Sequence, residues 1–199
     1  CVSEKTKEDL EALFGIDPSR ITVIPLGIAA VASSQDTNTR RVNLPEKFIL
    51  CFGAENPRKN AECLVAAFAR MRSIYPTLHD VGLVLIQTES CNTRRLKSQI
   101  RSFGLSDFCL IRSPLSLDER SVYYSRASLL AYPSLYEGFG LPVLEAMACE
   151  TPVVVTRKGG IPLAVKDGKN GLFIRSRNSS DIVEKVNYLF QNDQKRLKM

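Results

Sequence analysis

Short runs that are apolar throughout alternate along the chain with stretches in which apolar residues recur every three or four positions. The apolar runs predict buried strands at residues 48–52, 81–86, 108–111, 128–132, 152–155 and 172–174. The periodic stretches predict helices at residues 3–14, 60–75, 92–103, 116–126, 141–149 and 179–190, the last capped by Ser179 or Ser180. The alternation predicts one doubly wound, Rossmann-like α/β domain, with a parallel sheet and helices on both faces.

Composition narrows the possible functions. The chain has 199 residues, of which 44% are hydrophobic and 24% charged, which excludes disorder, collagen and coiled coil. Six cysteines without a C-x2-C pair and the single histidine, His79, argue against a zinc site and a Ser-His-Asp triad. The net charge of +6 favours an anionic partner, with a solvated basic surface as the alternative. Nucleic acid is not expected, because no basic run with interleaved aromatics occurs.

Two basic residues follow the first predicted strand. Arg58 and Lys59 lie directly before a helix, at the edge of the sheet where ligands of such folds bind. Because a helix N-terminus already carries positive partial charge, two cations there are unfavourable unless an anion binds. Free amides and both side chains together suit a phosphate. A solvated surface pair beside a proline turn is the alternative.

A glycine-rich loop with two glutamates follows the fourth predicted strand. Gly138 and Gly140 allow the backbone to approach a ligand, and Pro142 suits the first turn of the next helix. Glu137 precedes the helix and Glu145 lies about one turn inside it, so both can face one cleft. Two carboxylates suit the hydroxyl groups of a sugar or a ribose. A turn residue and a surface helical glutamate are the alternative.

Paired glycines, Gly159 and Gly160, follow the fifth predicted strand and precede a short helix. Their amides can turn towards a phosphate, although a plain turn is the simpler interpretation. Three anion-friendly loops at one edge of a parallel sheet predict a phosphorylated, hydroxyl-rich small molecule as the ligand.

The glutamate loop and the helix after it, from Glu137 to Ala148, resemble the two-glutamate motif of the family-4 retaining glycosyltransferases, which have the GT-B fold. Further segments resemble parts of the same family in the same order, at residues 2–10, 21–27, 57–60, 151–154, 159–162 and 167–171. The resemblance spans nearly the whole chain. It implies the nucleotide-sugar donor-binding, C-terminal half of such an enzyme.

The resemblance implies catalytic roles for Glu137, Lys59 and Arg58. The two cations would bind the diphosphate and stabilise its charge as it leaves, so that neither a metal nor another cofactor is needed. Glu137 would hold hydroxyl groups of the transferred sugar, and Glu145 would bind the ribose.

Other donor contacts are implied for neighbouring loops. The loop around Arg112 and Leu115 would hold the base, largely through backbone groups. The remaining implied donor contacts are Gly53 and the amides of Phe139, Gly140 and Leu141.

Four positions depart from the family pattern, and none is in the glutamate pair or Lys59: they are Leu26, Ala54, Glu150 and Leu163. Ala54 stands where many members carry an arginine. Glu150 stands where a glycine is usual, so we expect strain there if its φ is positive.

The resemblance implies transfer of a sugar from UDP-glucose or a related UDP-sugar to a polysaccharide or glycolipid, with GDP-mannose as an alternative donor. A nucleotide-binding module without transferase activity is a second hypothesis. An epimerase or a phosphorylase is a third, weakened because these loops lack a histidine and a pyridoxal-binding lysine motif.

Residues 1–199 are expected to form a single nucleotide-sugar-binding domain, without the acceptor-binding N-terminal domain and the final C-terminal segment of the family. Because GT-B enzymes catalyse transfer between two domains, we expect donor binding without useful transfer by this chain alone. We expect a cytoplasmic protein whose parent enzyme contacts the inner face of a membrane only through the absent half. The basic stretch at 94–101 is expected to be a solvated face.

Overall fold

A computed structural model describes residues 1–28, 43–88 and 93–199. The described residues form a six-stranded sheet with the order β3-β2-β1-β4-β5-β6, in which every neighbouring pair is parallel. The strands are Lys47–Phe52 (β1), Val81–Ile86 (β2), Cys109–Arg112 (β3), Leu129–Tyr132 (β4), Val153–Thr156 (β5) and Leu172–Ile174 (β6). The predicted parallel sheet is confirmed, with each strand within about a residue of its predicted bounds.

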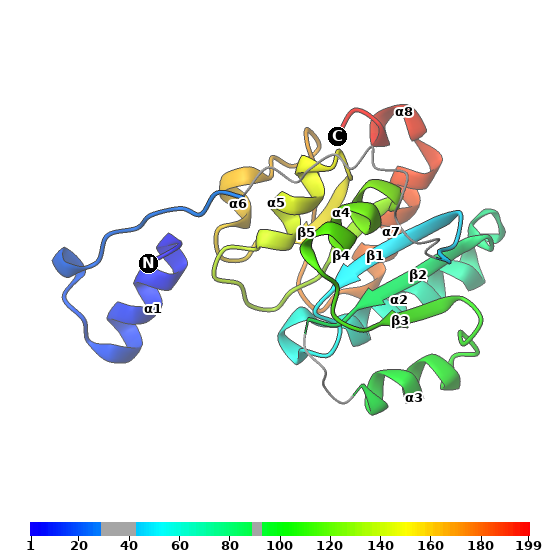
Figure 1. Cartoon of the computed structure of the whole chain (residues 1–199), viewed down its shortest axis with the longest axis horizontal. Coiled ribbons are helices and arrows are strands. Elements are labelled where there is room, and N and C mark those ends of the chain that lie inside the picture. The colour runs from blue at the N-terminus through cyan, green and yellow to red at the C-terminus, as the bar shows by residue number, and fades with distance from the viewer. Residues whose placement is uncertain (29–42, 89–92) are drawn as a thin grey trace.

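A helix follows each of the six strands, as a doubly wound fold requires (Figure 1). The helices are Glu4–Phe14 (α1), Ala61–Ile74 (α2), Arg94–Ser102 (α3), Leu117–Arg126 (α4), Leu141–Ala148 (α5), Ile161–Ala164 (α6), Ser179–Gln191 (α7) and Asp193–Arg196 (α8). Short 3-10 turns lie at Pro18–Arg20, Pro57–Lys59 and Pro76–Leu78.

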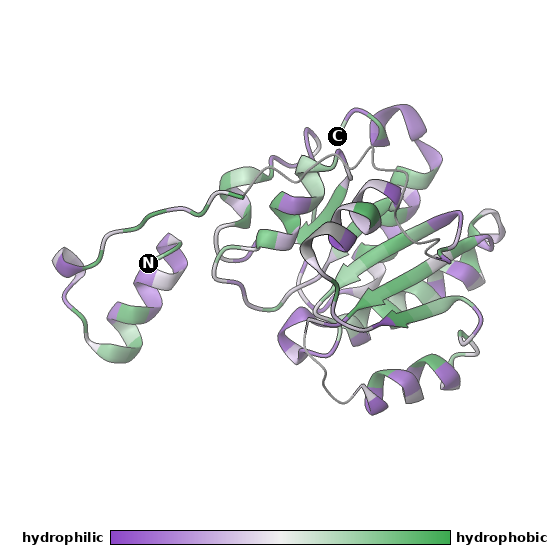
Figure 2. Ribbon diagram, viewed as in Figure 1, coloured by the Kyte–Doolittle hydropathy of each residue, from purple (hydrophilic) through white to green (hydrophobic). Residues whose placement is uncertain are grey.

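The sheet lies between two helical layers because its strands are apolar on both faces (Figure 2). Successive side chains of β1 point to opposite faces, so that Ile49 and Cys51 join one core and Leu50 and Phe52 the other. Helices α2, α3 and α7 cover the first face, and α4, α5 and α6 cover the second. The residues of β1 and β4 that face these two cores are almost completely buried.

The strand order reverses between β1 and β4, which lie side by side at the middle of the sheet. The chain moves outward from β1 through β2 to β3, then crosses back to β4 and moves outward the other way. After β1 the chain goes to α2 on one face, and after β4 it goes to α5 on the other face, so the usual ligand position of this fold is at the carboxyl ends of these two strands. The loop with Lys59 leaves β1, and the loop with Glu137 leaves β4.

One predicted detail is wrong, and another lies partly outside the described residues. The N-cap of α7 is Asn178, whose side chain accepts a hydrogen bond from the Asp181 amide at 3.0 Å, rather than Ser179 or Ser180. Asparagine is as good an N-cap as serine, so sequence alone does not decide between neighbours. The position of residue 92, with which the third predicted helix begins, lies outside the described residues, and α3 begins at Arg94.

Helix α1 stands apart from the sheet in Figure 1 and contains no buried residue. Ser3 caps its start and Gly15, with φ 63°, ends it, as the sequence predicts. Leu13 and Phe14 remain largely exposed. In the described ranges, none of the helices is long and apolar enough to cross a membrane.

Candidate functional site

A buried ion pair joins the two central loops. Lys59, in the turn Pro57–Lys59, places its ammonium Nζ 2.6 Å from Oε1 of Glu137. The Glu137 side chain is 7% exposed and that of Lys59 17%, so both charges are largely removed from water. Buried charges cost free energy unless they are closely paired, as these two are. The pair therefore places opposite charges where the strand order reverses.

Tyr132 completes this cluster. Its hydroxyl accepts a hydrogen bond from Lys59 Nζ at 2.5 Å, and the ammonium lies 4.8 Å from the centre of its ring. Burial, and next the nearby Glu137 carboxylate, raise the pKa of Tyr132 above its usual value. Tyr132 is not among the residues predicted from the sequence, because a tyrosine that ends an apolar strand looks like a core residue.

Gly53 makes room for the lysine. It follows β1 directly with φ 72°, and a Cβ built there would lie 2.9 Å from Cγ of Lys59. Gly53 was predicted as a donor contact. The structure also explains why a glycine is needed at this position. Without a side chain, residue 53 can adopt a positive φ and lets the aliphatic part of Lys59 pass close to the backbone.

The loops after β1 and β4 are tied together by their backbones. The Leu135 amide donates to the Arg58 carbonyl at 2.7 Å, and the Asn60 side-chain amide donates to the Pro133 carbonyl at 3.2 Å. The Arg58 side chain is exposed, and its charge acts on the Tyr136 hydroxyl. The structure thus brings Lys59 into the buried cluster and leaves Arg58 at its open side.

The paired glycines brace the glutamate loop. A Cβ at Gly159, whose φ is 53°, would lie 2.2 Å from the Glu137 carbonyl oxygen. The Gly160 amide donates to the Gly138 carbonyl at 3.1 Å, and a Cβ at Gly160 would lie 2.4 Å from the Phe139 ring. These glycines are therefore needed for close packing of two loops, a reason that the sequence-based alternatives of phosphate contact or plain turn did not include.

Glu145 is not a surface residue. Tyr124, on α4, donates its hydroxyl proton to Oε2 of Glu145 at 2.7 Å, and an Arg120 guanidinium nitrogen lies 3.9 Å from Oε1. Burial first, and then the Glu145 charge, raise the pKa of Tyr124 well above its usual value. Glu145 is thus oriented by a neutral donor. Tyr124 is not among the residues predicted from the sequence either, because a tyrosine within an amphipathic helix looks like a core residue.

The predicted amide contacts lie at the start of α5. Gly140 is its N-cap with φ 93°, where a Cβ would lie 2.6 Å from Cγ1 of Ile161. Phe139 is buried beside it, and Leu141 begins the helix. The first amides of a helix have no acceptor within the helix, so this turn offers donors to a ligand.

The predicted base-binding residues lie at the sheet's edge. Arg112 is the last residue of β3, and its guanidinium donates to the Asn43 carbonyl at 3.2 Å. Leu115 is partly buried and packs against the core below α4 and α5. The structure therefore anchors both residues beside the second face, without a contact that joins them to the Lys59 cluster.

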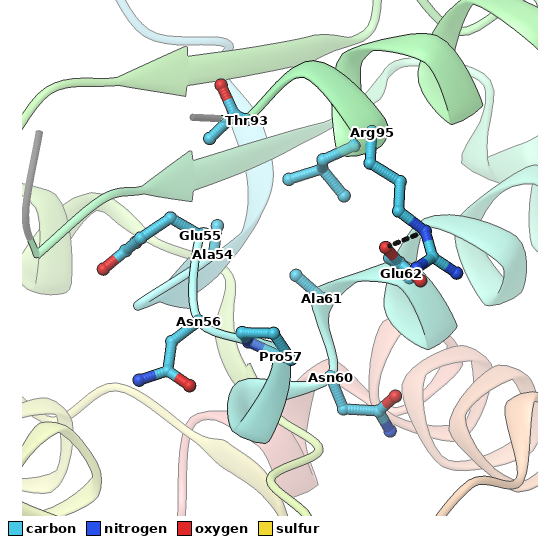
Figure 3. Close-up of a pocket in the computed structure, with 10 residues that line it drawn as sticks. Ala54, Glu55, Asn56, Pro57, Asn60, Ala61, Glu62, Thr93 and Arg95 are labelled. Atoms are coloured by element: carbon cyan, nitrogen blue, oxygen red, sulfur yellow. Dashed lines mark ion pairs between the residues drawn. The ribbon is translucent and has the colours of Figure 1, made fainter. Parts of the chain in front are cut away.

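A cavity of about 240 Å³ adjoins the loop after β1 (Figure 3). It is lined by that loop and by the starts of α2 and α3, and it includes Ala54 and the ion pair between Arg95 and Glu62 at 2.9 Å. Its walls contain neither Lys59 nor Glu137. Since the charged cluster lies elsewhere, the cavity is not the candidate site.

Helix α1 reaches the glutamate loop through one hydrogen bond. The Tyr136 hydroxyl donates to Oδ2 of Asp9 at 2.7 Å, and Lys5 pairs with Oδ1 of Asp9 at 2.8 Å. Lys5 first, and then Tyr136, lower the pKa of the Asp9 carboxyl. The N-terminal helix is thus connected to the residue that precedes Glu137.

Of the departures from the family pattern, Glu150 has the expected conformation, with φ 58°. Within the described residues, no group of three or more histidine, cysteine, aspartate or glutamate side chains could hold a metal ion. Independence from metals stays a prediction.

The family profile described as "Glycosyl transferases group 1" matches residues 34–199. The chain belongs to this family. Its sequence is 33% identical over 172 residues to a D-inositol 3-phosphate glycosyltransferase of Acidothermus cellulolyticus, over 81% of this chain and 38% of the relative. The chain spans less than half the length of the curated relatives it matches.

About half of each of several solved glycosyltransferases has the same architecture, which confirms the doubly wound domain expected for one half of a GT-B enzyme. Sucrose-phosphate synthase from Thermosynechococcus elongatus superposes with a TM-score of 0.80 at 25% identity, over 99% of this chain and 50% of that one. Anabaena HepE, in complex with UDP and glucose, superposes with a TM-score of 0.79 at 19% identity, over 98% of this chain and 54% of that one. The Anabaena likeness concerns the fold alone.

Proposed function

We propose that the chain is the nucleotide-sugar donor-binding domain of a retaining, family-4 glycosyltransferase. The observation that carries the proposal is the buried pair between Lys59 and Glu137, 2.6 Å apart where the strand order reverses. A cation and a carboxylate at this position suit a ligand that has both phosphate and hydroxyl groups. The family match and the fold support the same activity.

Each loop then has a role in the transfer. Lys59, with Arg58 at the open side, binds the diphosphate and stabilises the negative charge that grows as the bond to the anomeric carbon breaks. Glu137 binds hydroxyl groups of the sugar, and Glu145, oriented by Tyr124, binds the ribose. The Phe139, Gly140 and Leu141 amides complete the sugar and phosphate contacts. Gly53 borders the diphosphate, and the loop with Arg112 and Leu115 holds the base.

The donor is UDP-glucose or a related UDP-sugar, and the acceptor is a polysaccharide or glycolipid. No metal takes part, because the cations of the site fill that role. The acceptor binds to a further domain of the whole enzyme, through which any membrane contact is made, and the chain alone binds donor without useful turnover. The relatives' greater length supports this division. A cytoplasmic location stays a prediction.

Calorimetric titration tests the proposal. The wild-type chain is titrated without metal against UDP, GDP and ADP and against their glucose or mannose conjugates. Binding of one nucleotide family, tightest for UDP, is expected. Preference for GDP and GDP-mannose would replace the proposed donor, and absence of binding to every nucleotide would contradict a donor site in this chain.

A nucleotide-binding module without transferase activity remains testable through the full-length enzyme. The bracing of Glu137 by the paired glycines favours a transferase, because a module that only holds a nucleotide has no need to fix a carboxylate beside the sugar. Equal affinity for UDP and UDP-sugar, together with no transfer by the full-length enzyme, would favour the module.

A further inference from the structure

Tyr132 has a hydroxyl where packing alone needs none. It is the last residue of β4, it is fully buried, and its ring belongs to the core under α4 and α5. A phenylalanine would fill the same space without the cost of burying a polar group. The hydroxyl is engaged, because Lys59 Nζ donates to it at 2.5 Å.

The ammonium group of a lysine carries three N–H donors. In Lys59 one of them is directed at Tyr132 and another at Oε1 of Glu137, at 2.5 and 2.6 Å. Two fixed bonds leave the ammonium little freedom to rotate, so the direction of the third N–H is set. The Lys59 side chain keeps 17% of its surface exposed.

We propose that Tyr132 is a positioning residue of the donor site, whose hydroxyl fixes Lys59 so that its remaining N–H is directed at a diphosphate oxygen. This inference rests on the proposed function. Tyr132 acts through Lys59 and touches no reacting atom.

A neutral acceptor is suited to this task in a way that a second carboxylate is not. Tyr132 accepts a hydrogen bond without adding a second negative charge beside the ammonium, which already pairs with Glu137 at 2.6 Å. Glu137 holds the ammonium at 2.6 Å, and its carboxylate also shares a hydrogen bond with the Tyr132 side chain, so the three groups fix one another. Burial raises the pKa of Tyr132, which keeps the hydroxyl neutral at every physiological pH.

The test compares UDP with uridine, which lacks the diphosphate, in the full chain and its Tyr132→Phe variant. Affinities are measured by protein-observed NMR, which also follows weak nucleoside binding. We expect Tyr132→Phe to weaken UDP binding by roughly tenfold, the effect of losing one hydrogen bond to a charged group. Uridine affinity should stay within about twofold of wild type, because Lys59 does not contact the nucleoside.

Two control variants separate positioning from general damage. Tyr124→Phe removes another buried hydroxyl, which orients Glu145, and should weaken UDP and uridine to the same degree. Tyr188→Phe, on the partly exposed tyrosine of α7, should change neither affinity. Unchanged uridine binding shows that Tyr132→Phe is folded.

Unchanged UDP affinity in Tyr132→Phe, or an equal loss for UDP and uridine, would overturn the inference while leaving the donor site intact. Failure of the wild-type chain to bind UDP would instead contradict the proposed donor, which distinguishes the two failures.

Discussion

The two glutamates of one motif are held in different ways. Glu137 faces a cation at 2.6 Å and is 7% exposed, whereas Glu145 faces a neutral tyrosine hydroxyl at 2.7 Å and a guanidinium only at 3.9 Å. A buried tyrosine lies near each glutamate. Tyr124 donates a hydrogen bond to Glu145 directly, whereas Tyr132 accepts one from Lys59, the partner of Glu137. Around Glu137 a buried ammonium and carboxylate pair closely, whereas around Glu145 a carboxylate accepts a hydrogen bond from a neutral hydroxyl and lies farther from a guanidinium.

This difference matches the two halves of a nucleotide sugar. A phosphate needs a cation, and a ribose diol needs an acceptor whose lone pairs are not consumed by a close cation. Four kinds of change test this comparison. They alter the loop packed against Glu137, the two hydrogen-bonded pairs, the two buried tyrosines, and the residue that follows the helix carrying Glu145.

The largest effect is expected from Gly159→Ala. The new Cβ would meet the Glu137 carbonyl at 2.2 Å with φ 53°, so the backbone of one loop must move. We expect a loss of about 3 kcal/mol in the free energy of unfolding, from the clash and the left-handed conformation together. Urea denaturation measures it.

Gly168→Ala is the matched control. Gly168 has φ 71° but nothing within 4 Å of a built Cβ, so only the conformational cost of about 1 kcal/mol applies. Equal losses in the two variants would show that Gly159 does not brace the Glu137 loop.

The two ion-pairing patterns predict different coupling energies. A double-mutant cycle between Lys59→Met and Glu137→Gln should give about 2 kcal/mol, because either single variant leaves a buried charge without its partner. The cycle between Tyr124→Phe and Glu145→Gln should give about 1 kcal/mol. Both come from chemical denaturation. A larger value for the second cycle would reverse the comparison.

Alkaline pH probes the two tyrosines. Both phenols have a pKa raised above the usual value of 10.0, mainly by burial, so the folded protein keeps protons that the unfolded chain releases. Stability from this source is complete below pH 10 and falls as the pH rises further, by up to about 1.4 kcal/mol per pH unit and tyrosine.

Denaturant unfolding between pH 9 and 11 measures this dependence. Tyr132→Phe and Tyr124→Phe should each make the free energy of unfolding fall less steeply with pH above pH 10, by up to about 1.4 kcal/mol per pH unit. A slope that is unchanged from wild type in Tyr132→Phe would mean that its phenol is not protected from ionisation in the folded protein.

The smallest effect is expected at Glu150, which follows α5 with φ 58°. Glu150→Gly should raise the free energy of unfolding by about 0.5–1 kcal/mol, because glycine adopts this conformation without strain. Glu150→Ala is the control, since alanine keeps the strain. Stability is measured by thermal unfolding. If Glu150→Ala is stabilised as much as Glu150→Gly, backbone strain is not the cause of the stabilisation.

The fold could be predicted because its strands are apolar throughout and bounded by glycines and prolines. The strand order could not, since pairing of β1 with β4 is a tertiary choice that no local pattern encodes. The sequence therefore predicts only that Lys59 and Glu137 lie at the same edge of the sheet. It does not predict that their side chains are in contact.

The charged residues of the site could be predicted, and the neutral ones that orient them could not. Lys59, Glu137 and Glu145 differ in type from their apolar surroundings, whereas Tyr124 and Tyr132 resemble core residues until their hydroxyl partners are seen. Gly159 looks like a turn residue, because the carbonyl that excludes its Cβ comes from a loop 22 positions away, at Glu137.

A crystal structure of the wild-type chain with bound UDP tests the central assignment most directly. We predict a diphosphate oxygen within about 3 Å of Lys59 Nζ and a ribose hydroxyl at the Glu145 carboxylate. UDP bound instead in the 240 Å³ cavity between the loop after β1 and α3, with the pair of Lys59 and Glu137 untouched, would contradict it.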